Sequence, residues 1–268
     1  MTPRFFASLT DGPARYEPET PWAPVAAILA VIAIILSVSV LVDLFLLVLA
    51  VVQTTRTGSE PQIVTGSQSL SNVQTQILFG LQQALTIGLT VLAAYMYAGR
   101  PKTVLALHPV PRGVIIQSVI VLLAVSLFYT AVVFVFAKEA ILKDLAPFAQ
   151  ALNSENWIVL ALAVAIGAPL SEELLFRGFL FSALSKTRLG IIGTALLTNS
   201  AWTVLHFHYS IYGLIDVFLV GLVLSWLLWR TGSLWVTIAA HAIYNSIVLI
   251  GLWLAAHNDW LPTSSSAL

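Results

Sequence analysis

Charged and polar side chains interrupt long apolar stretches in the second half of this sequence. Two adjacent carboxylates occur at Glu172 and Glu173, an arginine follows at Arg177, and histidines stand at His206 and His241. If such a stretch spans a membrane, each charged residue in it costs at least about 2.5–3.5 kcal/mol and requires a partner, a water-filled cavity or a function. These residues are therefore the first candidates for chemistry.

The two glutamates face in different directions if the segment is helical. Neighbouring residues of a helix point about 100° apart, whereas Glu173 and Arg177, at i and i+4, share one face. One carboxylate can then pair with the arginine, and the other is left free, which suits a general base. Pro169 and Ser171, just upstream, predict that a helix begins again here, with Ser171 as its cap.

The two histidines each have a partner one helical turn away. His206 follows Trp202, and Asn245 follows His241. Two imidazoles, a carboxamide and a carboxylate from three helices are the groups needed to activate water and to stabilise an oxyanion, so the set predicts hydrolysis. Each residue alone could equally be an interhelical hydrogen bond or part of an ion pair, and only their joint occurrence favours function. Other polar residues of the apolar stretches are interpreted as structural: Asp43, Gln82, Gln83, His208 and Asp216.

The composition indicates that lipid is the solvent of the elements that carry these residues. Hydrophobic residues make up 59% of the chain and charged residues 9%, against roughly 25% charged residues in soluble domains. Apolar runs of about 20 residues cross a bilayer core of roughly 30 Å. We expect an all-α fold, a polytopic transmembrane helical bundle of about seven spans, with eight left open. The predicted spans cover about 24–52, 77–98, 113–137, 157–183, 190–207, 213–229 and 233–255.

The predicted domain organisation is one transmembrane helical domain, residues 24–256, between a polar N-terminal tail at 1–23 and a short C-terminal tail at 257–268. Lys and Arg are retained on the cytoplasmic side, so their distribution indicates orientation. We expect the N-terminus in the cytoplasm and the C-terminus outside, in the plasma membrane of a prokaryote. The cytoplasmic side would then hold Arg4, Arg15, Arg100, Lys102, Arg112, Lys186, Arg188 and Arg230, and the outside Arg56, Lys138 and Lys143.

The charge and cysteine content exclude several function classes. The formal net charge is zero and no basic block stands out, so nucleic acid is not an expected partner. The chain has no cysteine, which excludes disulfides, thiolate catalysis and Cys-ligated zinc. The expected partners are the lipid bilayer and a membrane-associated protein or peptide substrate.

Three short motifs resemble those of the CAAX-protease and bacteriocin-processing family of intramembrane proteases, which includes the type II CAAX prenyl endopeptidases. They are E-E-x-x-x-R at 172–177, W-x-x-x-H at 202–206 and H-x-x-x-N at 241–245, in this order within about 157–250. The departure from the family pattern is Trp202, where the second motif usually has Phe. It concerns packing more than catalysis.

The resemblance implies an intramembrane endopeptidase. Glu172 would act as general base with His206, together activating water for attack on a peptide carbonyl. His241 and Asn245 would bind the oxyanion. Glu173 and Arg177 would keep the other site residues in position. The catalytic residues implied are Glu172, Glu173, Arg177, His206, His241 and Asn245.

A zinc-dependent mechanism and a metal-free mechanism are both open for such a site. A hydrolytic zinc needs three protein ligands and an open position, which Glu172, His206 and His241 could supply. The H-E-x-x-H pattern, which places two ligands and a base on one helix face, is absent. We therefore lean toward a water activated by Glu and His, with zinc as the alternative cofactor.

Two other function classes compete with proteolysis. One is a non-enzymatic membrane scaffold or bacteriocin self-immunity protein in which the polar cluster is structural. The other is a transporter that uses the carboxylates and histidines as a relay, although the broken-helix pairs expected of that class are missing. The depth of His206 in the membrane is relevant to all three function classes: protease, scaffold and transporter. A full span at 190–207 would place His206 near the outer end of that span, away from Glu172 and His241.

Overall fold

The structure is a computed structural model that describes residues 6–57, 72–152 and 157–257. In these ranges the regular secondary structure is helical and contains no strand, which confirms the predicted all-α bundle. The elements are α1 (Ala7–Thr10), α2 (Pro24–Thr57), α3 (Asn72–Ala98), α4 (Pro101–Val104), α5 (Arg112–Leu152), α6 (Trp157–Leu162), η2 (Ala163–Gly167), α7 (Ala168–Glu172), η3 (Glu173–Leu180), α8 (Phe181–Leu184), α9 (Gly190–Val204), α10 (Ile211–Thr231) and α11 (Leu234–His257).

Six helical stretches of the described chain are long and apolar enough to cross a membrane. Large hydrophobic side chains point outward from the bundle, for example Phe136 at 80% exposure and Ile192 at 78%. A surface of this kind requires a lipid solvent, because water would oppose its exposure. The protein is therefore an integral membrane protein. The six stretches are Pro24–Leu49, Gln76–Met96, Arg112–Leu152, Trp157–Leu184, Ile211–Thr231 and Leu234–Ala255.

The remaining predicted span, 190–207, is the short helix α9. It has 15 residues, or about 22 Å at 1.5 Å per residue, which is less than a bilayer core of roughly 30 Å. The chain then turns at Leu205–Tyr209 and enters α10, which begins at the N-cap Ser210. His206 consequently lies in a turn inside the bundle and not at the outer end, as a full-length span would have placed it.

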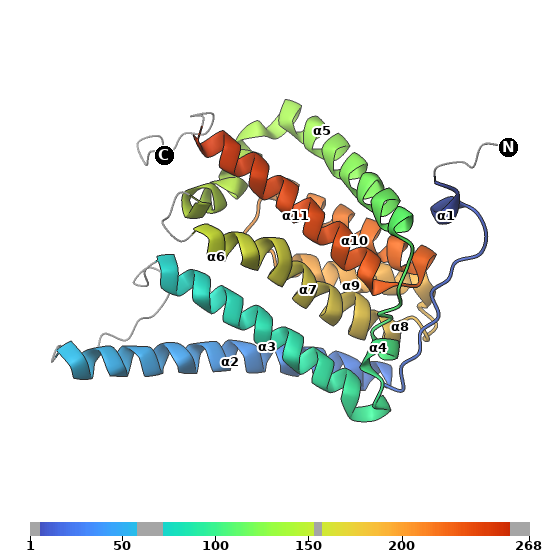
Figure 1. The fold of residues 1–268 in the computed structure, drawn as a ribbon, viewed down its shortest axis with the longest axis horizontal. Helices are drawn as coiled ribbons and strands as arrows, with labels where there is room; N and C mark the ends of the chain where they lie inside the picture. The colour runs from blue at the N-terminus through green and yellow to red at the C-terminus, as the bar shows by residue number, and fades with distance from the viewer. Residues whose placement is uncertain (1–5, 58–71, 153–156, 258–268) are drawn as a thin grey trace.

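The segment from α6 to α8 lies at the centre of the bundle, between the α2–α3 pair and a group formed by α5, α10 and α11 (Figure 1). It is one continuous helical path in which two π-helical stretches, η2 and η3, alternate with α-helical turns. The expected restart is therefore a change of helix type and not a break. Ser171 is not the predicted cap, because its hydroxyl donates to the Ala168 carbonyl at 3.0 Å.

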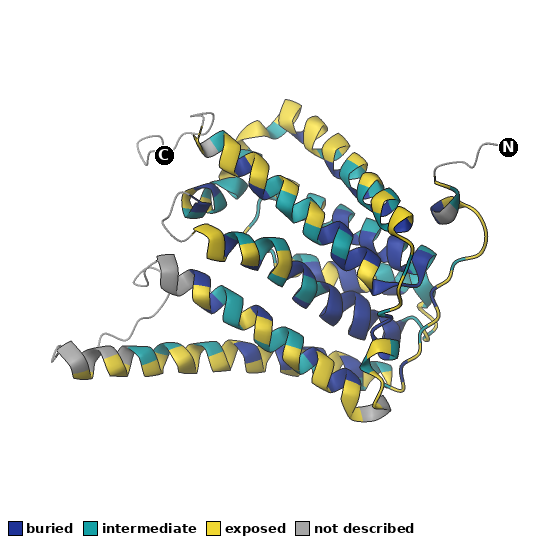
Figure 2. Ribbon diagram, in the orientation of Figure 1, coloured by how far each residue is buried: buried dark blue, intermediate teal, exposed yellow. Residues whose placement is uncertain are grey.

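The most deeply buried residues gather where η3 and α8 meet the adjoining parts of α10 and α11 (Figure 2). Phe179 and Phe181 are completely buried there, and so are the charged side chains of Glu173 and Arg177. A buried charge lowers stability unless it is paired, so Glu173 and Arg177 each require a partner at this end of the central helix.

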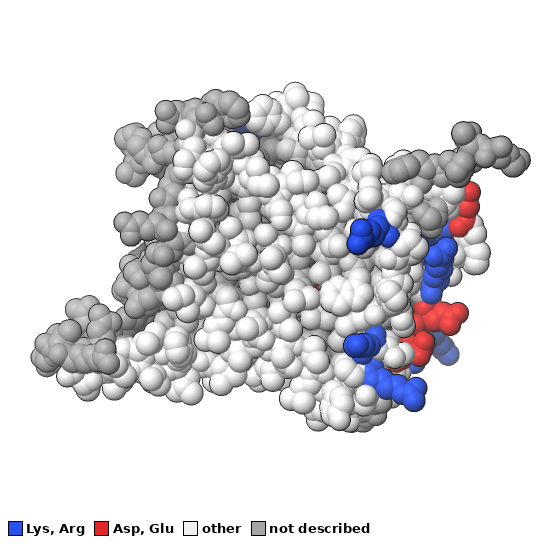
Figure 3. Space-filling model, viewed as in Figure 1, with Lys and Arg blue, Asp and Glu red and all other residues white. Residues whose placement is uncertain are grey.

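The charged side chains visible in Figure 3 gather at one end of the molecule, the end at which the N-terminal segment lies. This segment is held against the bundle and does not hang free. The Arg230 guanidinium donates to the carbonyls of Leu9 at 2.6 Å and Gly12 at 3.1 Å, and Lys186 donates to the Thr20 carbonyl at 2.6 Å. Both cations were expected on the cytoplasmic side, which remains a prediction.

Candidate active site

Four of the predicted site residues line one cavity of about 340 Å³: Glu172, His206, His241 and Asn245. Glu172 comes from α7, His206 from the turn after α9, and the other two from α11. Helices α3, α5 and α10 supply the other walls. Residues separated by more than 70 positions in the sequence thus meet around a space large enough for several waters.

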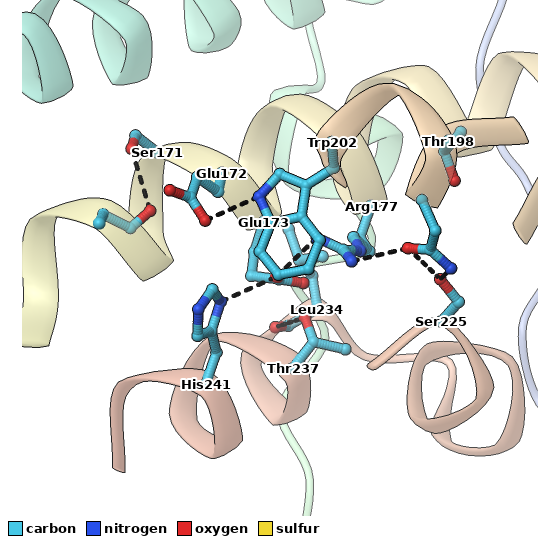
Figure 4. A network of polar contacts seen from close by, with 12 residues as sticks. Ser171, Glu172, Glu173, Arg177, Thr198, Trp202, Ser225, Leu234, Thr237 and His241 are labelled. Atoms are coloured by element: carbon cyan, nitrogen blue, oxygen red, sulfur yellow. Dashed lines mark hydrogen bonds and ion pairs between the residues drawn. The ribbon is translucent and has the colours of Figure 1, made fainter. Parts of the chain in front are cut away.

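The carboxylate of Glu172 is oriented by Trp202. The indole Nε1 donates to Glu172 Oε2 at 2.9 Å (Figure 4), and the other carboxylate oxygen has no hydrogen-bond partner among the described residues. Trp202 is only 2% exposed, so its position is fixed by packing. The substitution of Trp for the family's Phe therefore does more than change packing, because it adds a hydrogen-bond donor beside the candidate base.

The Trp202 ring also lies at the centre of the other candidate groups. The Arg177 guanidinium stands over the ring at 4.2 Å from its centroid, an arrangement in which the cation meets the negative face. The edges of the His206 and His241 rings approach it with centroid distances of 5.2 Å and 5.7 Å. One side chain thus contacts four of the predicted site residues: Glu172, Arg177, His206 and His241.

Glu173 and Arg177 form the ion pair that their helical spacing predicted. Arg177 Nη1 donates to Glu173 Oε1 at 3.1 Å, and both side chains are completely buried. The same Oε1 lies 3.1 Å from His241 Nδ1. Because a carboxylate oxygen can only accept, Nδ1 carries the proton in this contact, and Glu173 fixes the orientation of the imidazole ring.

His206 is oriented in a similar way by the backbone. Its Nδ1 lies 3.0 Å from the carbonyl oxygen of Trp202, so Nδ1 donates and Nε2 is left for another partner. The turn that carries His206 is closed by hydrogen bonds from its N–H to Thr203 and from the Tyr209 N–H back to His206, both at 2.9 Å. The histidine therefore sits on a defined turn.

Asn245 is held by a carbonyl that the central helix leaves unpaired. In η2 the hydrogen bonds run five residues back, as the Ala168 N–H bonded to the Ala163 carbonyl shows. The carbonyl of Val164 would then accept from residue 169, which is a proline without an N–H. Asn245 Nδ2 fills this place at 2.9 Å. Its carboxamide keeps one N–H and its oxygen for other partners.

Three further residues complete the support of Arg177, and the sequence analysis did not name them. Asn199 Oδ1 accepts from Arg177 Nη2 at 2.7 Å, and Asn199 Nδ2 donates to Ser225 Oγ at 3.3 Å. A Cβ atom on Gly221 would lie 2.6 Å from Asn199 Oδ1 and 2.7 Å from Arg177 Nη2. Asn199 could have been found as a polar residue in an apolar run, whereas nothing in the sequence distinguishes Gly221.

The far wall of the cavity is joined to the His206 turn by Asp144 of α5. Its two oxygens accept from Ser210, from the backbone N–H at 2.8 Å and from the hydroxyl at 2.6 Å. The α5 helix reaches this point because it kinks at Ala137, where the predicted span 113–137 ends, and continues to Leu152. Asp144 thereby ties α5 to the start of α10.

Tyr209 brings a phenol to the same cavity. Burial, together with the nearby carboxylates Glu172, Asp144 and Asp216, raises the pKa of Tyr209 to about 12. A phenol in these surroundings stays protonated at any physiological pH and remains a hydrogen-bond donor.

The three candidate zinc ligands all line the cavity, but they do not form a metal site. Within the described ranges no three His, Asp or Glu side chains are close enough together to hold one ion. As they are placed, Glu172, His206 and His241 do not converge on one ion position, and the proposed reaction uses no metal.

Comparison with known proteins gives one match. Residues 154–247 match the family model described as type II CAAX prenyl endopeptidase Rce1-like. This range holds all three motifs, and the match confirms the family resemblance inferred from them. A search of curated proteins and a search of solved structures found no match.

Proposed function

We propose that this protein, whose residues 154–247 match the Rce1-like family model, is an intramembrane protease that hydrolyses a peptide bond in or near the membrane with a water activated by Glu172 and His206. The observation that carries the proposal is the convergence of Glu172, His206, His241 and Asn245 on one cavity from separate helices. A cluster kept only for structure would have no need of the enclosed space.

Glu172 is suited to be the general base. The Trp202 indole holds one of its oxygens, which leaves the other to take a proton from water. His206, whose Nδ1 is occupied, can hold the same water through Nε2. The hydroxide adds to the peptide carbonyl, and the proton on Glu172 then passes to the leaving amine nitrogen as the C–N bond breaks.

His241 and Asn245 are suited to bind the oxyanion that forms at the attacked carbonyl. Nδ1 of His241 donates to Glu173, which turns Nε2 away from this partner, and a proton on Nε2 would supply the donor for the oxyanion. Asn245 contributes the N–H that Val164 does not use. Donors fixed in advance at a developing negative charge are usually the largest single contribution to such a reaction.

The substrate of this reaction is a protein or peptide that reaches the cavity from the bilayer. We place the N-terminus in the cytoplasm and the C-terminus outside, in a prokaryotic plasma membrane, because Lys and Arg gather at the end where the N-terminal segment lies. Whether a substrate carries a prenyl group is open, since apolar surface alone does not distinguish one.

The proposal is tested by a cleavage screen of membrane peptides with purified protein in liposomes. Wild-type protein should cleave at least one peptide, with or without a chelator. His206→Ala should lower the rate by about 10²-fold or more, because the water loses its second partner. Phe207→Ala is the matched control, since this neighbour is 79% exposed. Equal rates for His206→Ala and Phe207→Ala would contradict the role of His206, and absence of cleavage by the wild-type protein would support the scaffold or self-immunity alternative.

A further inference from the structure

The cavity has an uneven charge. Three of its lining residues are acids, Asp144, Glu172 and Asp216, and none of the described residues that line it is Lys or Arg. The nearest buried cation, Arg177, is committed to Glu173 and Asn199 and does not line the cavity. A substrate entering this space therefore meets carboxylates that no lysine or arginine among the described lining residues balances.

The three acids differ in their hydrogen-bond partners. Both oxygens of Asp144 accept from Ser210, and Glu172 accepts from Trp202. Asp216 accepts from the Tyr244 hydroxyl through Oδ2, at 3.1 Å. Its Oδ1 is buried and has no hydrogen-bond partner within the described part of the chain.

An unpaired carboxylate oxygen inside a membrane span is costly, and such residues are normally paired or functional. The only ion pairs among the described residues are those of Glu173 with Arg177 and His241. The cation that would pair with the Asp216 carboxylate therefore comes from another molecule. We infer that Asp216 is a specificity-determining residue, which binds an ammonium or guanidinium group of the substrate peptide.

The position of Asp216 places that group near the scissile bond. Asp216 lines the same cavity as Asn245, which we assign to the oxyanion. The inference rests on the proposed function and narrows it. Peptides with a lysine or arginine beside the cleaved bond fit the cavity, and the acidic wall repels a free terminal carboxylate in the same place. The interpretation of Asp216 as structural is replaced by this role.

The test uses synthetic apolar peptides of about 20 residues, long enough to span a bilayer, in phosphatidylcholine vesicles. Each peptide of the set carries one lysine, one norleucine or one glutamate at a stated distance from the cleaved bond. Wild-type protein should prefer lysine over norleucine at one such position by about tenfold or more in kcat/KM, as expected of a buried charged pair. Asp216→Asn keeps the Tyr244 partner and should remove this preference while leaving norleucine peptides nearly unaffected. Asp43→Asn, in α2 and outside the cavity, should keep the preference.

The outcomes separate this inference from the proposed function. Cleavage without a preference for lysine, or an equal loss for both peptides in Asp216→Asn, overturns the inference and leaves the protease intact. Binding is measured in parallel with Glu172→Gln protein, which needs no cleavage. Lysine peptides should bind this variant more tightly than norleucine peptides. The difference in affinity should become smaller when Asp216→Asn is added. Absence of that difference overturns the inference whatever the cleavage assay shows.

Discussion

Trp202 donates its indole N–H to the carboxylate of Glu172 at 2.9 Å, across two helices of the bundle. The second motif of the family usually has Phe at this position, which is smaller than Trp and cannot donate a hydrogen bond. In this chain the aromatic residue therefore orients the candidate base directly. The bond leaves one carboxylate oxygen of Glu172 for water, which is the geometry a general base requires.

The first prediction concerns this hydrogen bond. Trp202→Phe keeps an aromatic ring between the histidines and Arg177 but removes the donor. We expect kcat to fall about tenfold, because hydrogen bonds to charged groups contribute roughly 1.5–3 kcal/mol. KM should change little in steady-state cleavage, and thermal unfolding should show a loss of stability, because the smaller ring leaves part of the buried Trp202 site empty. A variant with the wild-type kcat would show that the indole N–H has no part in orienting Glu172.

The second prediction concerns the space beside Arg177. A methyl group added by Gly221→Ala would lie less than 3 Å from both Asn199 and Arg177, so this polar network must shift. We expect lower thermal stability and lower activity together, since Arg177 supports both Glu173 and the Trp202 ring. Gly251→Ala is the control, because a methyl group there meets no atom within 4 Å. If both variants unfold at the same temperature, the network is more adaptable than its burial indicates.

The third prediction concerns the link between α5 and the His206 turn. Asp144→Ala removes the acceptor of two Ser210 hydrogen bonds and frees the turn that carries the histidine. We expect kcat to drop several-fold and hydrogen exchange to increase at residues 206–210, since losing a buried acceptor costs about 1–3 kcal/mol. The neighbouring Lys143→Ala changes an exposed residue and serves as the control. Unchanged exchange in Asp144→Ala would contradict a positioning role.

The fourth prediction follows from the raised pKa of Tyr209. Burial and the nearby carboxylates move this pKa from 10.0 to about 12, so the folded protein holds the phenolic proton more tightly than the unfolded chain. This contribution to stability is complete below pH 10 and is lost as the pH rises from 10 to 12. Wild-type protein should therefore lose stability over this window relative to Tyr209→Phe, by about 2–3 kcal/mol. Parallel unfolding curves for the two proteins across that range would exclude the burial of the phenol.

Much of the site could be predicted from the sequence because charged residues in a lipid-embedded helix are conspicuous. Glu172, His206, His241 and Asn245 were found this way, and the structure brings them to one cavity. Gly221 could not be found, because its importance is the absence of a side chain next to Arg177. The role of Asp144 also depends on a kink in α5 that hydropathy does not reveal.

The fold was predicted well where hydropathy alone decides it and less well where helix length matters. Six predicted spans correspond to helices long enough to cross the bilayer. Residues 190–207 are as apolar as the others, yet α9 stops at Val204 because the chain must turn to bring His206 back into the bundle. The π-helical turns on either side of Pro169 were expected as a helix start. A proline is typical of the first turn of a helix and also of places where the helical hydrogen bonds are interrupted.

The central claim is that Glu172 activates the attacking water. Its most direct test is the single-turnover cleavage of a bound membrane peptide by Glu172→Gln, which keeps an acceptor for the Trp202 indole but cannot take a proton. Glu139→Gln, an exposed glutamate of α5, is the matched control. The account predicts a fall of about 10²–10⁴-fold in the cleavage rate with peptide binding unchanged. Cleavage by Glu172→Gln at the rate of the control would contradict it.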